Sequence, residues 1–203
     1  MSALLAACLP SSPSDNLIDA ATSGDLASIK AAIAAKADIN AQNEDGKTAL
    51  GYAAAHGQMP VVAALISAGA DINAEGTEVE AQTPLMMAAA EQPEAVKALI
   101  DAGANVNAIS GSRTTALDVA AVFGQSDSIR ALVHAGAKID AAEAAMTPLA
   151  FASYNGRDDA VQTLLDLGAN PNPQSGGMSP LAAAMASKHD NIANMLRQRG
   201  ARE

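Results

Sequence analysis

Aromatic side chains are scarce in this sequence: only 2% of its 203 residues are Phe, Tyr or Trp, and Trp is absent. Apolar residues make up 49% of the chain, so most of them are Ala, Leu, Ile and Val. Alanine favours helices and lets them approach closely, because its side chain is small and loses no rotamer freedom. The composition therefore predicts a fold of closely packed helices.

Basic residues are also few, since 12 Lys and Arg stand against 22 Asp and Glu and give a net charge of −10. A surface that binds nucleic acid needs clustered Lys and Arg to neutralise phosphates. The charge therefore argues against a nucleic-acid partner. Acidity also raises solubility, which is its simplest explanation.

Long apolar runs and paired cysteines are missing as well. No apolar run reaches roughly 18 to 20 residues, the length that a helix needs to span a bilayer. Cys8 is the only cysteine, so the chain cannot form an internal disulfide. Cysteine usage therefore does not assign a redox compartment.

What the chain does have is a repeated pattern. Units begin with KTALGYAAAHG, QTPLMMAAAEQ, TTALDVAAVFG, MTPLAFASYNG and MSPLAAAMASK, after a degenerate first copy, NLIDAATSG. They end in SAGADINA, DAGANVNA, HAGAKIDA, DLGANPNP and QRGARE, and the first copy ends in AKADINA. The shared residues Leu50, Leu85, Leu117, Leu149 and Leu181 lie 35, 32, 32 and 32 residues apart. A period of this length indicates a solenoid of stacked units.

Each unit predicts two helices followed by an extended segment. A Thr or Ser caps the first helix, and Pro follows it in three units at the favoured first helical position. A second helix follows a turn, with apolar residues at 3- and 4-residue spacing, such as Val62 and Leu65. The capping residues are Thr48, Thr83, Thr115, Thr147 and Ser179. After a leader of residues 1–14, the approximate units are 15–46, 47–81, 82–113, 114–145, 146–177 and 178–203.

The T-P-L-x-x-A starts and G-A-D-x-N ends recur in register, and on these motifs the sequence resembles the ankyrin repeat family. The resemblance covers residues 15–203 and implies an all-α repeat solenoid of about six stacked repeats, each a helix-turn-helix with β-hairpin loops. The His that usually follows T-P-L is absent, which removes a polar tie from each unit; Asp118 stands there in the fourth. The third unit also lacks a Gly between its helices, and the loop before it, NAEGTEVEAQ, is longer than its neighbours.

Motifs that hold a nucleotide or calcium are incomplete. The segment Gly46–Thr48 resembles the end of a phosphate loop, but Ala41 stands where that loop needs Gly. The segment DINAQNEDG offers oxygen ligands, yet Asn43 and Ala49 replace the Gly and Glu that a calcium loop needs. Neither segment therefore predicts a bound cofactor.

Catalytic and metal-ligating groups do not converge either. The three histidines, His56, His134 and His189, fall at different positions of different units, so they cannot surround one metal. No Ser, Cys or His pair forms a nucleophile–base arrangement. We therefore expect no enzyme activity, no cofactor and no metal.

The ankyrin resemblance implies that a partner protein binds to the concave face, made of the hairpin tips and the exposed end of each first helix. Phe123 and Tyr154 fall on that exposed end in adjacent units, whereas Tyr52 and Phe151 fall at a core-facing position. Aromatic residues contribute strongly to protein binding. The alternatives are that both rings pack against neighbouring helices, and that His56 is an ordinary surface residue. The candidate contact residues are His56, Glu91, Val122, Phe123, Tyr154 and Asn155.

The hairpin tips carry acidic side chains. Glu44 and Asp45 lie in one tip, and Glu78 and Glu80 lie in the next. Opposite charges steer two proteins together, so these tips predict a partner with a basic surface. The alternative is that each carboxylate is a solvated charge on a loop.

The N-terminal stretch LLAACLPSSPSD bears on the compartment. LLAAC resembles the L-A-[AG]-C box of bacterial lipoproteins, which implies cleavage before Cys8, lipidation of its thiol, and a Ser/Pro tether after it. A secretory signal needs a basic region and about 7 to 15 apolar residues, whereas only MSALLAA precedes Cys8. We therefore expect that the true start lies upstream of Met1. The alternative is a disordered leader on a cytosolic protein, with Cys8 incidental.

Together these features predict a non-enzymatic protein–protein interaction module that works as a monomer. By analogy with bacterial ankyrin proteins, we expect a periplasmic envelope protein, lipid-anchored at Cys8, that protects, inhibits or scaffolds its partner. The first alternative is a cytoplasmic ankyrin adaptor. A remote alternative is an enzyme or small-molecule sensor, which a large closed cavity near Phe123 and Tyr154 would favour.

Overall fold

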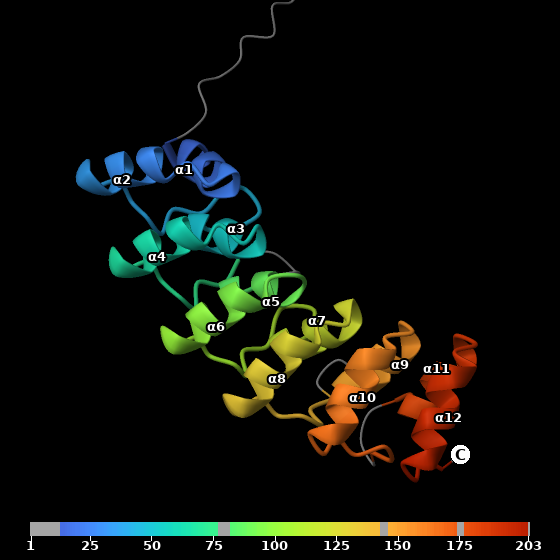
Figure 1. The fold of residues 1–203 in the computed structure, drawn as a ribbon. Helices are drawn as coiled ribbons and strands as arrows, with labels where there is room; N and C mark the ends of the chain where they lie inside the picture. The colour runs from blue at the N-terminus through green and yellow to red at the C-terminus, as the bar shows by residue number, and fades with distance from the viewer. Residues whose placement is uncertain (1–12, 77–81, 143–145, 174–176, 203) are drawn as a thin grey trace, which may run out of the picture.

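Six helix pairs stack side by side into a curved solenoid in the computed structural model, which describes residues 13–76, 82–142, 146–173 and 177–202 (Figure 1). We call each pair a unit. The units are α1 Pro13–Ser23 with α2 Leu26–Ala34, α3 Ala49–Ala55 with α4 Met59–Ser67, α5 Pro84–Ala89 with α6 Pro93–Asp101, α7 Ala116–Phe123 with α8 Ser126–His134, α9 Pro148–Tyr154 with α10 Asp158–Asp166, and α11 Pro180–Ala186 with α12 Asp190–Gln198. The all-α repeat solenoid that the sequence predicts is thus confirmed.

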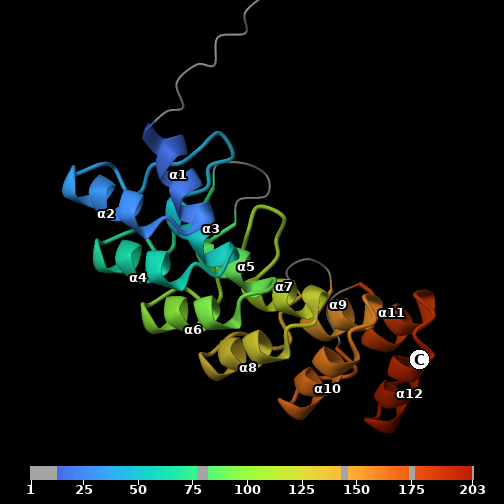
Figure 2. The ribbon, with the colours of Figure 1, turned by 45° about the horizontal axis from the view of Figure 1, so that its top comes forward.

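The first and second helices form two separate rows, with the odd-numbered helices in one row and the even-numbered helices in the other (Figure 2). Helix α1 begins at Pro13, so the helical array includes two residues that the sequence-based boundary assigned to the leader. Five loops join one unit to the next, and we call them fingers 1 to 5. They span residues 37–47, 70–82, 104–114, 137–146 and 169–178.

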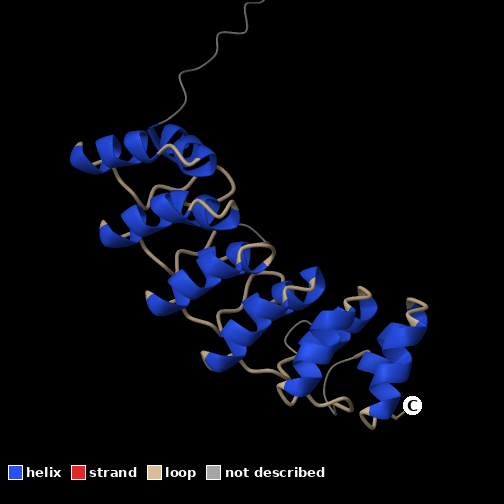
Figure 3. Ribbon diagram, in the orientation of Figure 1, coloured by secondary structure: helices blue, strands red, loops and turns tan. Residues whose placement is uncertain are grey.

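The fingers are turns rather than developed hairpins. No strand occurs in the part of the chain that the structure describes (Figure 3), and the β-pairing found there is a single antiparallel bridge between Gln42 in finger 1 and the capping residue Thr48 that follows this finger. The β-hairpins implied by the family resemblance are therefore reduced to one bridge in these ranges.

The predicted helix caps are present in every unit from the second onward. The Thr48 hydroxyl accepts a hydrogen bond from the Gly51 backbone N–H at 3.3 Å, and Thr83, Thr115, Thr147 and Ser179 cap in the same way. Such a cap contributes about 1 kcal/mol. These helices have only 6 to 8 residues, so they depend on their caps and on packing with neighbouring units.

Asp118, which stands where the family pattern usually has His, forms a polar tie of its own in the fourth unit. Asp118, 2% exposed, accepts hydrogen bonds from both the backbone N–H and the hydroxyl of Thr115, each at 2.8 Å. The Thr115 hydroxyl oxygen in turn accepts from the Asp118 N–H at 3.2 Å, which completes a capping box. The sequence predicts that each unit loses a polar tie, and this prediction is wrong for the fourth unit.

The core runs through all six units because equivalent positions are apolar and small. The shared leucines Leu50, Leu85, Leu117, Leu149 and Leu181 are at most 2% exposed. Between them lie fully buried alanines, Ala53, Ala88, Ala120, Ala152 and Ala184. Because an alanine adds little bulk, neighbouring first helices approach closely, as the composition predicted.

In units 1, 2, 4 and 5 the turn between the two helices contains a glycine that a side chain of the next unit covers, and we call each such turn a joint. Gly57, with φ +64°, ends the first helix of unit 2, and the Gln92 side chain of unit 3 occupies the space that a methyl group there would need. Gly124, with φ +79°, is covered in the same way by Arg157, whose Nε donates to the Val122 carbonyl at 2.9 Å. A side chain is thus excluded by backbone conformation and by the neighbouring unit together.

A ladder of hydrogen bonds links the base of one finger to the next. The Asn73 side-chain oxygen, for example, accepts from the Asn105 backbone N–H at 2.8 Å. The other links run from Asp71 N–H to Asn40, from Lys138 N–H to Asn107, from Asn170 N–H to Asp140, and from Arg202 N–H to Asn172. The fingers therefore keep a fixed order along one side of the array.

Candidate binding surface

The ends of the first helices and the fingers form one continuous surface, which we call the inner face. Its helical part consists of residues 55–56, 90–91, 122–123 and 154–155, which follow the capping residues at equal distances. The residue just before each capping residue also belongs to it: Lys47, Gln82, Thr114, Met146 and Met178. The inner face thus contains an equivalent pair of residues from each of units 2 to 5 and an equivalent residue before the cap from each of units 2 to 6.

The two aromatic rings that the sequence assigned to this face are exposed. Phe123 is 46% exposed and Tyr154 is 49% exposed, and their helices α7 and α9 pack directly against each other. Val122 beside them is half-buried, and Asn155 is exposed with its amide donating to the Phe151 carbonyl at 2.8 Å. Each ring therefore leaves about half of its surface in solvent.

The other two aromatic residues pack against the core as predicted, and one of them holds His56. Tyr52 and Phe151 are partly buried against the core cluster. The exposed His56 ring stacks on Tyr52 with centroids 6.3 Å apart and an interplanar angle of 17°. His56 Nδ1 lies 2.9 Å from the Tyr52 carbonyl, and because a carbonyl only accepts, this nitrogen carries the proton. His56 is therefore oriented on the inner face.

Three exposed apolar residues escaped the sequence analysis. Ile109 is 46% exposed, Met178 39% and Met185 48%. Met185 occupies a place where the inner units have Ala54, Ala89, Ala121 or Ser153, all fully buried, and it is exposed because no unit follows it among the described residues. The exposure of Met178 could have been predicted from its repeat position, because it directly precedes a capping residue, as Lys47 does.

The acidic candidates divide into two groups. Glu44, Asp45 and Glu91 are exposed on the inner face, and Glu75 in finger 2 is exposed as well. Glu78 and Glu80 lie outside the described residues. The Gln42 amide donates to the Glu75 carbonyl at 3.0 Å, which ties finger 1 to finger 2. The described carboxylates of these two fingers are thereby held in neighbouring loops.

The carboxylates with lowered pKa values lie away from the inner face. The Ser28 hydroxyl and N–H hold the pKa of Asp25 below its usual range. The pKa of Asp166 is lowered by the Gln162 amide and then by Arg199, whose guanidinium lies 2.6 Å from the carboxylate. Both carboxylates are exposed and stabilised in the charged form, so neither has the raised pKa of a general acid.

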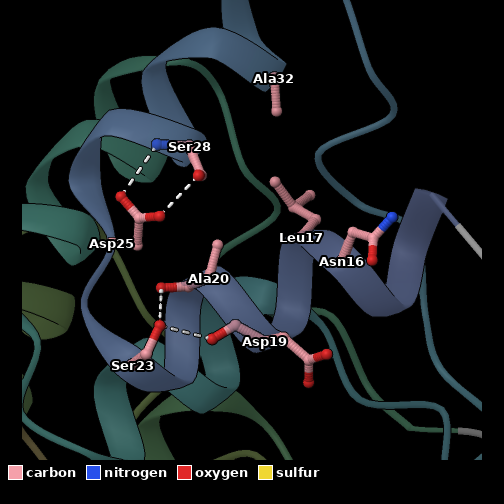
Figure 4. A pocket seen from close by; sticks show the side chains of 8 residues that line it. All are labelled: Asn16, Leu17, Asp19, Ala20, Ser23, Asp25, Ser28 and Ala32. Atoms are coloured by element: carbon pink, nitrogen blue, oxygen red, sulfur yellow. Dashed lines mark hydrogen bonds between the residues drawn. The ribbon is translucent and has the colours of Figure 1, made fainter. Parts of the chain in front are cut away.

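Two surface depressions are open to solvent, whereas a catalytic site is usually enclosed. The larger, about 570 Å³, lies at the N-terminal end of the array between α1 and α2, where Asp25 accepts from Ser28 (Figure 4). It is lined by Asn16, Leu17, Asp19, Ala20, Ser23, Asp25, Ser28 and Ala32. The one beside Phe123, about 290 Å³, is rimmed by Arg157, Asp158 and Asp159. Both are open to solvent rather than the closed cavity that would favour an enzyme or sensor.

Within residues 13–76, 82–142, 146–173 and 177–202, no three His, Cys, Asp or Glu side chains gather into a group suited to a metal ion. No helix in these ranges combines the length and the apolar character that crossing a membrane requires. Cys8 lies outside them.

Comparisons with known proteins agree with this architecture. A family model described as ankyrin repeats (3 copies) matches residues 17–110, 77–143 and 117–202. The crystal structure of the human ASB11 ankyrin repeat domain is similar, with 26% sequence identity and a TM-score of 0.81. That match covers 95% of this chain and 85% of the ASB11 chain. No curated protein matches the sequence.

Proposed function

Because the chain belongs to the ankyrin repeat family, whose repeats serve as protein–protein interaction modules, we propose that it binds one partner protein through its inner face and catalyses no reaction itself. One observation carries this proposal. Phe123 and Tyr154 each leave nearly half of their surface in solvent, in adjacent units of a chain with only four aromatic residues. Aromatic rings of this kind are frequent centres of binding energy.

A cross-linked pull-down from the native organism tests the binding proposal. Wild-type protein is compared with the double variant Phe123→Ala, Tyr154→Ala, and with a control that carries Lys97→Ala and Arg130→Ala on the even-numbered helices. We expect wild type and control to capture the same protein and the double variant to lose it. Equal capture by all three would overturn the assignment of the inner face.

We also propose that the protein works in the bacterial envelope, on the periplasmic side, anchored by a lipid on Cys8, where it protects, inhibits or scaffolds its partner. The L-A-A-C motif and the Ser/Pro-rich stretch after it support this location. The alternative proposal is a cytoplasmic ankyrin adaptor, in which Cys8 has no role.

The location can be tested independently of binding. The DNA upstream of Met1 is read for an in-frame start that adds a basic and apolar segment. The complete gene is then expressed with an alkyne fatty-acid label, in wild-type form and as Cys8→Ser. Label in the wild type but not in the variant is the expected result. An upstream region without such a segment would eliminate the export proposal and leave the binding proposal intact.

A further inference from the structure

The inner face changes in chemistry along the array. Before the capping residues, the series reads Lys47, Gln82, Thr114, Met146, Met178, from polar to apolar. At the ends of the first helices, His56 and Glu91 give way to Phe123 and Tyr154. All exposed large apolar side chains of the described ranges lie at or after residue 109. Of these side chains, Ile109, Phe123, Tyr154 and Met178 lie on the inner face, so its part from finger 3 to finger 5 forms an apolar zone.

The opposite zone is acidic. Glu44, Asp45 and Glu75 are exposed in fingers 1 and 2, which the Gln42 amide links. Among the described residues of the later fingers, 104–114, 137–142, 146, 169–173 and 177–178, Asp140 is the one acidic residue, and its carboxylate accepts from the Asn170 backbone N–H; Glu143 lies outside these residues. A partner that complements both zones needs positive charge at one place and an apolar side chain at another.

The stacking fixes the separation between the zones. From α3, which follows finger 1, α7 lies two units on and α9 three units on. Neighbouring helices pack roughly 8 to 10 Å apart, so the zones are separated by roughly 16 to 30 Å. An extended chain spans this distance in about 5 to 9 residues, and a helix spans it in about 11 to 20 residues.

We propose that the inner face takes one continuous partner segment with two parts: a basic stretch over Glu44, Asp45 and Glu75, and an apolar anchor at Phe123 and Tyr154. The inference rests on the proposed function and adds the chemistry and spacing of the partner. Methionine side chains adapt to different apolar shapes, so Met146 and Met178 let the anchor be aromatic or aliphatic. The acidic fingers select the basic stretch and set the direction of the segment.

A display library of random peptides of about 24 residues, long enough for either conformation, tests the proposal. Peptides are selected on the wild type and counter-selected on Phe123→Ala, Tyr154→Ala. We expect the enriched peptides to carry a Lys/Arg cluster and an apolar residue separated by one of the two spacings. A library with no enriched peptide, or one enriched without basic residues, would overturn the proposal.

Fluorescence anisotropy with the best peptide then separates the two zones. We expect Glu44→Gln with Asp45→Asn to weaken binding about fivefold at about 50 mM NaCl and little at about 500 mM, because salt screens the acidic zone. The matched control, Glu94→Gln with Asp101→Asn, removes the same charge from α6 and should have no such effect. An equal loss in both pairs would refute the acidic zone.

The native partner distinguishes this inference from the proposed function. A captured partner that needs Phe123 and Tyr154 but binds Glu44→Gln, Asp45→Asn as tightly as the wild type at low salt would refute the two-part segment alone. A partner indifferent to both aromatic substitutions would refute the proposed function as well.

Discussion

In unit 2 the first helix ends at His56, whose ring is stacked on Tyr52, whereas in unit 4 the same place holds Phe123, whose ring is 46% exposed. Both helices are capped by a threonine and contain a fully buried alanine at the same position, Ala53 or Ala120. Units 2 and 4, one from each half of the array, thus have the same backbone, caps and core residues, whereas their side chains on the inner face differ. Positions that set the fold are therefore separate from the positions that we propose to set binding.

Substitutions of the glycines at the joints should have the largest effect on the free energy of unfolding. This effect should be similar in unit 2 and in unit 4. We expect Gly57→Val and Gly124→Val each to lower the free energy of unfolding by about 3 kcal/mol. A left-handed backbone costs about 1 to 2 kcal/mol for an L-residue, and overlap with Gln92 or Arg157 adds to it. Chemical denaturation measures the loss.

Gly103→Ala is the matched control for these joints. Its φ is +92°, but no atom lies within 4 Å of an added Cβ, so it tests backbone conformation without overlap. It should cost less than either joint variant. If Gly103→Ala costs as much as they do, the covering side chains contribute nothing and the joints are a matter of backbone alone.

Substitutions on the inner face should weaken partner binding to different degrees in the two halves of the array. We expect Phe123→Ala with Tyr154→Ala to weaken partner binding by roughly 30-fold, about 2 kcal/mol, and to leave the melting temperature almost unchanged, because both rings are half exposed. His56→Ala with Glu91→Ala should weaken it by less than about threefold. Calorimetric titration and thermal melting give both values, and a large fall in melting temperature for the aromatic pair would show that the rings belong to the core.

Two lysines in left-handed conformation give a smaller effect of opposite sign, one in each half. Lys36 has φ +55° and Lys188 has φ +60°, at places where other units carry glycine. We expect Lys36→Gly and Lys188→Gly each to stabilise the fold by about 1 kcal/mol, because glycine adopts this conformation without strain. Destabilisation by either substitution in a denaturant titration would contradict this account.

Acid sensitivity should be the smallest effect. The lowered folded pKa values of Asp25 and Asp166 contribute stability above the ordinary value of 3.8, and this stability is lost as pH falls through the lowered values. Asp25→Asn and Asp166→Asn should therefore reduce the fall in melting temperature below about pH 4. Asp101→Asn serves as the matched surface substitution, and a pH profile that it changes as much as the other two would rule out the hydrogen bonds as the cause.

The fold was predictable because its signals repeat. Five capping residues and five leucines recur in register, and each repetition makes a chance match less plausible. The exposed rings of Phe123 and Tyr154 were predictable for the same reason, since their place relative to the caps fixes their side of the helix. A repeat pattern thus predicts backbone and direction together.

What the sequence did not predict depends on neighbours. Met185 occupies a position that is buried in the preceding units from the second onward, and its own 48% exposure depends on which residues pack against it rather than on its place in the repeat. Asp118 appeared as the loss of a polar tie, but its hydrogen bonds with Thr115 require a specific rotamer that spacing does not reveal. No single position predicts the chemistry that we propose for the partner. That chemistry follows only from a comparison of equivalent positions across units.

The ladder at the base of the fingers has a consequence for how such a chain evolves. Each rung pairs a side-chain acceptor in one unit with a backbone donor in the next, as Asn73 pairs with Asn105. A gene segment that encodes one whole unit carries one acceptor and one donor, so its duplication lengthens the ladder without a new compatible mutation. Duplication can thus extend the inner face, and later substitutions can give each copy its own chemistry.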